Sequence, residues 1–480
     1  MKKTLLTILG CVAALTTWAQ TPRVEVFQLQ GALVDSLPGS VVQGVSLNGE
    51  WAVGYGTEYC QKSFIWNRTT GEFSLLTGSF LNQAYAAGVS NDGTVVGAYC
   101  ADLSGDSTEY MVAGYWKDGV WTALPMENGF TYTSGLEANV NGEARFISAD
   151  GAYITGYIHS NTFKRTFYDE TGALVETRTV SLMRPAIWTR RTDGTYKLER
   201  KSSKLPSGDE LQQGIWANYG ASQDAKVIPV VADHPTGSRS PAVIVGDSLI
   251  RIYGKEDLDI SLDITQYFYD GVSVSCSPNG KYVPGYWDFY GNGYDLVAFV
   301  YDTETDSVEE IEGWGAATVA LDDGTLYGFD GYMGTATIRT ADKSFCGTLS
   351  DYLNLYYDGY SGDLPQTIFS VSADGRTIGG WYAVADAIGA VMYPSIVLLN
   401  GDPNAEPNGV AAQMADRRSI LTLEGEVVAP GATTVQLYTP QGTLLAETSA
   451  DRISTVGHQG VLVVKATYPD GKVETRKVVL

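Results

Sequence analysis

The residues best suited to chemistry in this sequence are aromatic side chains that stand beside aspartate, asparagine and glycine. The densest group runs from Tyr286 to Tyr294, and a second runs from Tyr356 to Tyr360. Flat rings can stack on the apolar face of a sugar while neighbouring polar groups bond its hydroxyls. The candidate ligand-binding residues are therefore Trp287, Tyr290, Tyr294, Tyr357 and Tyr360. The alternative is that these rings pack inside the fold, between its repeated units.

One segment matches a motif for nucleophilic catalysis, but the partner residues that the motif requires are missing. Residues 246–249 read Gly-Asp-Ser-Leu, as in the nucleophile block of GDSL-type esterases. Those enzymes also need a late Asp-x-x-His, whereas His458 has Thr455 three residues before it. We interpret Gly246-Asp247 as a hairpin turn instead.

The other polar residues show no pattern of a catalytic, cofactor or metal site. His159 and His234 stand alone, and the acidic run from Asp257 to Asp263 lacks the glycine and terminal glutamate of a calcium loop. The sequence therefore predicts no catalytic, cofactor-binding or metal-binding residue. A hydrolase with carboxylates from distant segments stays open as an alternative, because such a pair needs no linear motif.

The elements that must position these side chains come from an internal repeat. A phrase of the type Val-Ser-x-Asp-Gly occurs seven times with variations, at 45–49, 89–93, 147–151, 221–225, 276–280, 320–324 and 371–375. Asp-Gly or Asn-Gly supplies the positive φ angles of a tight turn, and the serine hydroxyl can bond the turn backbone. Each copy thus predicts a strand, a turn and a strand. A second glycine usually follows and marks a close approach of backbones.

A second hairpin follows each copy, beginning with strands such as 64–66 and 186–188. Two hairpins make four strands, and the spacing between successive copies is 44 to 74 residues, close to the roughly 40–50 residues of a propeller blade. We predict an all-β fold in which residues 20–400 form a β-propeller of about seven blades; six or eight also fit. We expect residues 24–29 to close the ring beside 395–399.

The repeated phrase, with a later apolar strand that ends in tryptophan, resembles the extracellular HAF-type repeat. The resemblance covers roughly residues 40–400 and implies a secreted β-propeller. That family has no defined catalytic set, so the resemblance transfers no site residue.

Cysteines are few and widely spaced. Cys60, Cys100, Cys276 and Cys346 remain after the N-terminal segment, and none forms a CxxC pair. Cys60 and Cys100 follow the same element in adjacent repeats, so they are the candidate disulfide. Buried unpaired thiols are the alternative.

The N-terminus predicts export. Lys2 and Lys3 precede an apolar run from Leu5 to Leu15, and residues 17–19 offer small residues before Gln20. This pattern is typical of a secretory signal peptide over residues 1–19. A lipoprotein that uses Cys11 is the alternative. No later stretch reaches the roughly 20 apolar residues of a transmembrane helix, so we expect no transmembrane segment.

The charge argues against nucleic acid as a partner. The chain has 55 acidic and 32 basic residues, a formal net charge of -23, and no basic patch. Phosphate binding needs clustered lysine and arginine.

A separate module is predicted at the C-terminus. Residues 401–417 are rich in proline, asparagine and alanine and predict a linker, and residues 418–480 contain short strands at about ten-residue spacing, which predict a small β-sandwich. The strands at 435–438, 460–466 and 477–480, with turns at Gly442 and Gly471, resemble the C-terminal sorting domain of the type IX (Por) secretion system of Bacteroidetes. Leu462 replaces the usual aromatic residue. The resemblance implies that outer-membrane secretion machinery is a partner of residues 418–480.

Together these features predict a protein that is secreted or held on the outer cell surface after signal-peptide cleavage. We expect a non-catalytic binding module for a glycan or a protein, with no cofactor. The alternatives are a polysaccharide-degrading enzyme of the propeller type and a structural protein of a surface layer.

Overall fold

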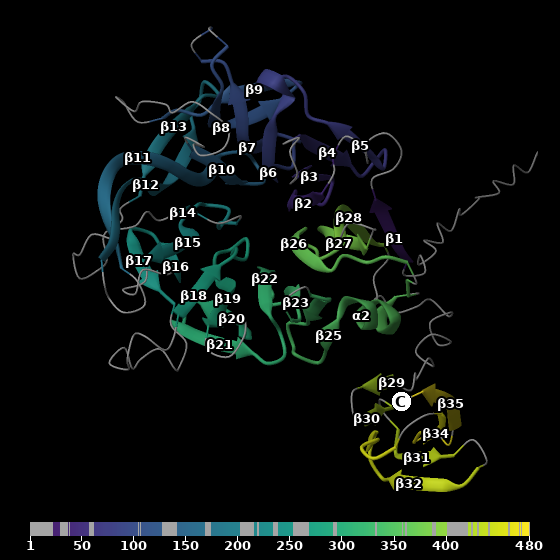
Figure 1. Cartoon of the computed structure of the whole chain (residues 1–480). Coiled ribbons are helices and arrows are strands. Elements are labelled where there is room, and N and C mark those ends of the chain that lie inside the picture. Colours follow the sequence, from purple (N-terminus) through teal and green to yellow (C-terminus); the bar gives the residue numbers. More distant parts are fainter. Residues whose placement is uncertain are drawn as a thin grey trace, which may run out of the picture. The chain divides into compact units, whose positions relative to one another are not determined.

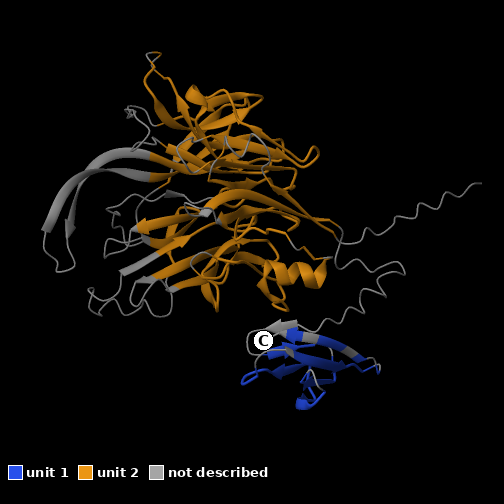
Figure 2. Ribbon diagram, turned by 45° about the vertical axis from the view of Figure 1, so that its right-hand side comes forward, with its two compact units in different colours: residues 1–21, 401–480 blue, residues 22–400 orange. Residues whose placement is uncertain are grey.

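The structure is a computed structural model, and it describes residues 23–28, 37, 39–56, 62–103, 105, 107–126, 142–168, 174–201, 216–217, 220–233, 239–252, 268–290, 295–331, 334–357, 359–360, 362–385, 390–400, 421–423, 426–429, 432–439, 442–458, 461–469, 471 and 473–479. The chain divides into two compact units, Pro22–Asn400 and a second made of Met1–Thr21 and Gly401–Leu480 (Figure 2). The predicted signal peptide (1–19) and linker (401–417) lie outside the described residues.

The larger unit is a β-propeller. Its described strands form seven four-stranded antiparallel sheets around a common axis (Figure 1). Blades 1 to 4 are, in order, β2 (Ser40–Val45), β3 (Trp51–Gly56), β4 (Ser63–Asn67) and β5 (Glu72–Leu75); β6 (Ala84–Val89), β7 (Val95–Ala101), β8 (Tyr110–Lys117) and β9 (Val120–Ala123); β10 (Gly142–Ile147), β11 (Tyr153–Tyr168), β12 (Leu174–Arg190) and β13 (Tyr196–Arg200); β14 (Trp216–Ala217), β15 (Val227–Asp233), β16 (Arg239–Val245) and β17 (Ser248–Arg251).

The remaining blades follow the same plan. They are β18 (Phe268–Ser273), β19 (Tyr282–Tyr290), β20 (Asp295–Asp302) and β21 (Ser307–Ile311); β22 (Ala316–Ala320), β23 (Leu326–Phe329), β24 (Ala336–Arg339) and β25 (Cys346–Thr348); and β26 (Thr367–Val371), β27 (Thr377–Ala385), β28 (Ala390–Asn400) and β1 (Arg23–Gln28). The short helix η1 (Phe80–Asn82) precedes β6, and α2 (Leu349–Tyr356) follows β25. The predicted all-β fold and its blade count of seven are confirmed for the described residues.

The ring is closed by the first strand, as the sequence predicted. β1 pairs with β28 in antiparallel register, from Arg23 opposite Asn400 to Gln28 opposite Ser395. Across the closing interface, Phe64 and Trp66 of blade 1 are fully buried with Ile396 of blade 7. Closure therefore buries the faces of the first and last blades against each other and removes their exposed edges.

The glycine that follows each turn is required by a bulge in the innermost strand. In blade 2 the pairing of β6 with β7 shifts between Ala86 and Gly88, and a Cβ added to Gly97 would lie 1.8 Å from the carbonyl oxygen of Tyr85. The same shift occurs in blades 1, 3, 6 and 7. The predicted close approach of backbones is confirmed, since no side chain fits where the bulged strand presses on its neighbour.

The smaller unit has two described sheets. One has the order β29 (Leu421–Leu423), β30 (Glu426–Val428), β33 (Arg452–Ser454), and the other β32 (Leu444–Thr448), β31 (Thr434–Tyr438), β34 (Val461–Thr467), β35 (Val473–Val479). Val427, Val435, Leu437 and Val464 are fully buried in one core. Alternate residues of each strand face this core, as in a small sandwich.

Candidate functional site

The two ends of the propeller are built differently. At one end, which we call the turn end, five residues join the first strand of a blade to the second in five blades: 46–50, 90–94, 148–152, 321–325 and 372–376. The opposite end, the loop end, carries the connections between blades, which range from four residues between β21 and β22 to eighteen between β9 and β10. Variable connections on a rigid scaffold are where binding residues concentrate.

Each repeat turn satisfies its own polar groups. Ser90 Oγ donates to Asp92 Oδ1 at 2.6 Å and accepts from the Thr94 backbone N–H at 3.1 Å. Equivalent serine bonds at 2.6–2.8 Å occur at Ser46, Ser148, Ser222, Ser277 and Ser372. In the fourth copy Ala225 takes the glycine conformation, with φ of 55°, so the turn keeps its shape at the cost of backbone strain.

Neighbouring turns are also bonded to one another. The backbone N–H of the residue after the motif serine donates to the next blade at Asn91 (to Ala149 O, 2.9 Å) and at Gln223 (to Pro278 O, 2.8 Å), and Ala373 donates to Leu47 O at 2.9 Å across the closure. Further links are Asn48 N–H to Asn91 Oδ1, Ala149 N–H to Gln223 Oε1 and Asn279 N–H to Asp322 Oδ1. The repeated motif therefore has a structural role, because its hydrogen bonds hold the turns of neighbouring blades together.

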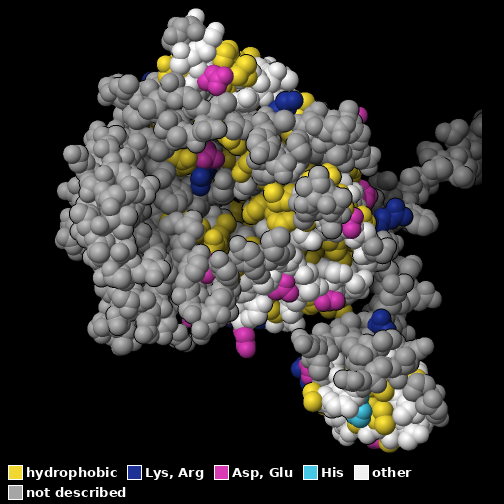
Figure 3. Space-filling view, viewed as in Figure 1, with side chains coloured by type: hydrophobic (Ala, Val, Ile, Leu, Met, Phe, Trp, Pro, Cys, Tyr) yellow, Lys and Arg dark blue, Asp and Glu magenta, His cyan; other side chains and the backbone are white. Residues whose placement is uncertain are grey.

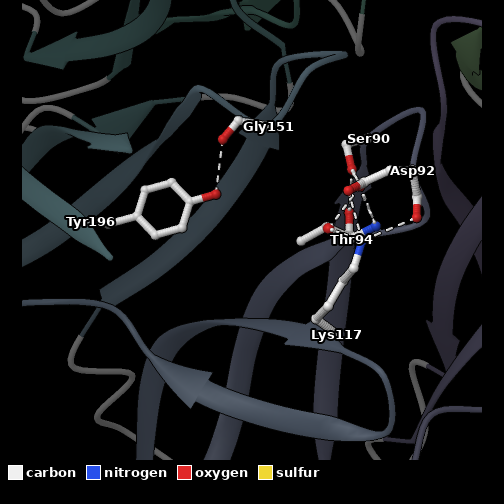
Figure 4. A network of polar contacts seen from close by, with 6 residues as sticks. All are labelled: Ser90, Asp92, Thr94, Lys117, Gly151 and Tyr196. Atoms are coloured by element: carbon white, nitrogen blue, oxygen red, sulfur yellow. Dashed lines mark hydrogen bonds and ion pairs between the residues drawn. The ribbon is translucent and has the colours of Figure 1, made fainter. Parts of the chain in front are cut away.

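Two of the described turns carry an added ion pair, Lys226 with Asp224 and Lys117 with Asp92, and the second of these is drawn in Figure 4. Lys117 Nζ lies 2.6 Å from Asp92 Oδ2 and donates to Thr94 Oγ1 at 3.0 Å. Partial burial acts to raise the pKa of Asp92, but hydrogen bonds from Lys117, Ser90 and Thr94 outweigh it and hold that pKa well below its usual range. These groups already bond one another, so this network stabilises the turn end.

At the loop end, the first and second strands of blades 1 to 3 carry a group of charged and aromatic side chains. We call this group the mouth cluster: Tyr55 of β3, Tyr85 of β6, Glu143 and Arg145 of β10, and Tyr157 of β11. β10 begins at the loop end, and Glu143 lies opposite Tyr157 in the sheet. Arg145 stands at the bulge between Ala144 and Phe146.

An ion pair is the centre of the mouth cluster. Arg145 Nη2 lies 3.0 Å from Glu143 Oε2, and Nε donates to the same oxygen at 3.1 Å. The two side chains are only 14% and 12% exposed. Figure 3 shows that the propeller is hollowed in its middle, with a basic and an acidic side chain adjacent inside the hollow. A low-exposure pair of this kind holds its geometry better than a surface pair does.

Tyrosine rings flank the pair. The Arg145 guanidinium lies over the Tyr157 ring, 5.0 Å from its centroid. Tyr55 meets the half-buried Tyr85 edge to face at 5.3 Å. Burial, and then the charge of Glu143, raises the pKa of the Tyr85 phenol, so this hydroxyl stays protonated and can donate. The cluster therefore offers donors, acceptors and ring faces in one place.

The sequence analysis missed Glu143 and Arg145. Aligning the seven copies on the motif serine would have found them, because they are the charged residues five and three positions before it. Their spacing alone matches no known motif.

Trp287, the aromatic residue predicted to bind a ligand at the surface, requires a correction. It is fully buried in β19, with its ring centroid 4.3 Å from that of Phe299, in a core shared with Val243 of the preceding blade. Tyrosine and tryptophan on a strand between two blades pack on the neighbouring sheet, so this ring is closed to a sugar. The alternative of packing between blades is the one that the structure shows for Trp287.

Of the other four predicted residues, the structure describes the side chains of two, Tyr357 and Tyr360, which pack in one core. Tyr357 is 8% exposed in the core below α2, and Tyr360 is half-buried against the same core. The side chain of Tyr290, and all of Tyr294, lie outside the described residues.

The predicted disulfide is not seen. Cys100 is buried with a free thiol, and Cys60 lies outside the described residues, so the pairing stays a prediction. Burial, and then the charge of Glu109, raises the pKa of the Cys100 thiol to about 11, which makes it a poor nucleophile at neutral pH.

The Gly-Asp-Ser-Leu motif forms a turn. Gly246 has φ of 63° in the hairpin between β16 and β17, as predicted.

Among the residues described, no group of three histidine, cysteine or acidic side chains is placed to hold a metal ion. No helix in the described part of the chain is long and apolar enough to cross a membrane.

One pair of acidic residues is aligned near the loop end. Asp270 of β18 lies directly opposite Asp288 of β19, and Asp288 is buried. Residues opposite each other in antiparallel strands have Cβ atoms about 5 Å apart, and like charges there are unfavourable. The side chain of Asp270 lies outside the described residues, so only the register of the two strands is given.

No known protein family matches the sequence, and no curated protein matches it. Structural similarity is found to TolB from Acinetobacter baumannii, at 13% identity and a TM-score of 0.32, over 59% of this chain and 58% of that chain. The Dos1 propeller matches at 11% identity and a TM-score of 0.35, over 78% and 95%. Acylaminoacyl peptidase from Pyrococcus horikoshii matches at 10% identity and 0.40, over 90% and 58%. These similarities are too low for a conclusion about function.

Proposed function

We propose that this protein is an exported β-propeller that binds a glycan or protein ligand at its loop end without catalysing a reaction. The observation that carries the proposal is the difference between the two ends. At the turn end, the polar groups of the repeated motif are hydrogen-bonded within the turns themselves and to neighbouring blades. At the loop end, connections of unequal length join the blades, and a charged pair of low exposure lies against a tyrosine ring. A converging, chemically varied face of this kind is what ligand binding uses.

The binding face can be tested with a matched pair of glycines in blade 2. Gly105 lies in the β7–β8 connection at the loop end, and Gly119 lies in the β8–β9 turn at the turn end. Both have positive φ, 72° and 87°, and nothing lies within 4 Å of an added Cβ. Each is replaced by cysteine in a protein that lacks Cys60 and the exposed Cys346, and is coupled to a 5-kDa polyethylene glycol.

Ligands are first sought on a glycan array, with product analysis of any bound oligosaccharide, and by cross-linking to surface proteins of the producing cell. We expect saturable binding without turnover, blocked by the polymer at residue 105 and not at residue 119. Block at residue 119 alone would move the site to the turn end. Cleavage of a bound glycan would replace the binding function by hydrolysis.

The proposed export rests on the N-terminal pattern and on the resemblance of residues 418–480 to a sorting domain. We expect the mature protein to begin at Gln20 and to be found outside the outer membrane, released or on the cell surface. The measurement is N-terminal sequencing and cell fractionation of the intact protein and of a version without residues 418–480. Normal export of the shortened version would contradict the sorting role.

Hydrolysis of a polysaccharide is the second candidate function, and the alignment of Asp270 with Asp288 is the observation that favours it. Two carboxyl groups about 5–10 Å apart can serve as the acid and the base or nucleophile of a glycosidase. If the protein cleaves a glycan, we expect Asp288→Asn to abolish cleavage.

A further inference from the structure

The seven blades provide an internal comparison for the mouth cluster. Five positions before the motif serine, blade 3 has Glu143, and the other blades have Val41, Tyr85, Ala217, Val272, Ala316 and Thr367. Three positions before it, blade 3 has Arg145, and the others have Gln43, Ala87, Tyr219, Val274, Thr318 and Phe369. Blade 3 therefore carries a charge at two positions where every other copy is uncharged.

The fold does not need this ion pair. The bulge that holds Arg145 is formed equally well by Ala87 in blade 2 and by Phe369 in blade 7. Removing two charges from water is costly, and uncharged residues of similar size are commonly as stable or more stable in such a place. The repeat architecture forms the same bulge without this ion pair, and the two side chains are only 12–14% exposed. An ion pair that is costly to bury and not needed by the fold points to a role in recognition.

The charges decide which ligand fits. Glu143 neutralises Arg145, whose Nε and Nη2 both contact the same carboxylate oxygen, and the full chain has a formal net charge of -23. An anionic ligand would find no unbalanced positive charge at this ion pair, and the net negative charge of the protein would repel it. A neutral molecule with adjacent hydroxyl groups can donate to the carboxylate and accept from the guanidinium at the same time.

We propose that the mouth cluster is a binding site for a neutral sugar, with Glu143 and Arg145 bonding its hydroxyl groups and Tyr85 contacting its ring. Tyr85 is half-buried on β6, which packs directly beside β10: a Cβ added to Gly88 of β6 would lie 3.4 Å from the backbone oxygen of Arg145. This inference rests on the proposed function and names the ligand class and the residues within the loop end.

The test uses the full chain and direct titration by calorimetry. The neutral probes are cellohexaose, mannohexaose and maltoheptaose, and the acidic probes are hexagalacturonate and sialyllactose. The variant is Glu143→Gln with Arg145→Met, which keeps side-chain size and has uncharged precedents in the other blades. The matched control is Asp92→Asn with Lys117→Met, which removes the ion pair at the turn end.

We expect the wild type to bind at least one neutral probe, the mouth variant to bind it about 10- to 100-fold more weakly, and the control variant to bind as the wild type does. The melting temperature of the mouth variant should not fall, which excludes unfolding as the cause. Tyr85→Phe should weaken binding less than Tyr85→Ala, because the ring face is retained.

Unchanged binding by the mouth variant, binding of acidic probes only, or binding of none of the probes would overturn the inference. The proposed function is separable from it: if the mouth variant still binds its ligand and the polymer at residue 105 still blocks binding, the loop end is the binding face and the mouth cluster is not the site. If the polymer has no effect, the proposed function itself fails.

Discussion

Replacement of Gly97 by alanine should destabilise the propeller strongly, although alanine in a strand is ordinarily preferred to glycine. Gly97 lies opposite Ala86, at the bulge of β6. Its Cβ would lie 1.8 Å from the Tyr85 carbonyl oxygen and 3.1 Å from the Ala86 Cα. Since ordinary contacts of this kind exceed about 3 Å, the strands must move apart by more than about 1 Å in the best-packed layer of the blade. Overpacking of this size costs about 3 kcal/mol of unfolding free energy.

The matched control is Gly347→Ala in the outermost strand β25. There the nearest atom to an added Cβ is the ring tip of Phe345, at 3.2 Å, a contact that a shift of a few tenths of an ångström relieves. We expect its unfolding free energy to stay within about 0.5 kcal/mol of the wild type. The assay is urea unfolding followed by tryptophan fluorescence. If Gly97→Ala were no less stable than Gly347→Ala, the account of the second glycine as a requirement of the bulge would be refuted.

Further predictions concern stability and closure. Ala225→Gly should raise the unfolding free energy by about 1 kcal/mol in urea titrations, because it relieves a positive φ; an unchanged value would exclude strain at this turn. The pKa of Asp92 is lower in the folded than in the unfolded protein, so its carboxylate stabilises the fold above the unfolded pKa of about 4, and this stabilisation is lost as the pH falls through the folded pKa. The difference in melting temperature between wild type and Asp92→Asn should therefore shrink below pH 4. A difference that does not change with pH would exclude this coupling between the Asp92 charge and stability. Trp287→Ala should lower the free energy of unfolding in urea by about 3–5 kcal/mol, because the ring is fully buried, and should leave the glycan affinity of the folded protein unchanged. Loss of binding without loss of stability would show instead that Trp287 contacts the ligand. Deletion of residues 20–30 should lower the melting temperature because β1 completes the last blade, and an unchanged melting temperature would contradict that role.

Much of the fold was predictable because its signals are local. Ser90, Asp92 and Gly93 specify a turn within five residues, and the structure forms that turn with the predicted serine bonds. Seven such signals therefore predicted seven blades. The closing strand was predictable for a related reason, since the last blade would otherwise lack one strand.

The candidate site was not predictable in the same way. Trp287 stands in an aromatic run that reads like a binding surface, but both faces of a propeller blade are covered, so strand alternation does not separate buried from exposed rings. Glu143 and Arg145 match no motif by themselves; they stand out only when the seven copies are aligned on the motif serine, and the structure then places them on the first strand of blade 3.

The sequence by itself determined the turns, the repeat count and the strand that closes the ring, because each depends on residues near one another or on the number of copies. The tertiary structure decided which side chains meet. Tyr55, Tyr85 and Glu143 come from three consecutive blades, and they lie near one another only because the sheets of neighbouring blades pack side by side. Such proximity depends on how whole sheets pack, and no local pattern encodes it.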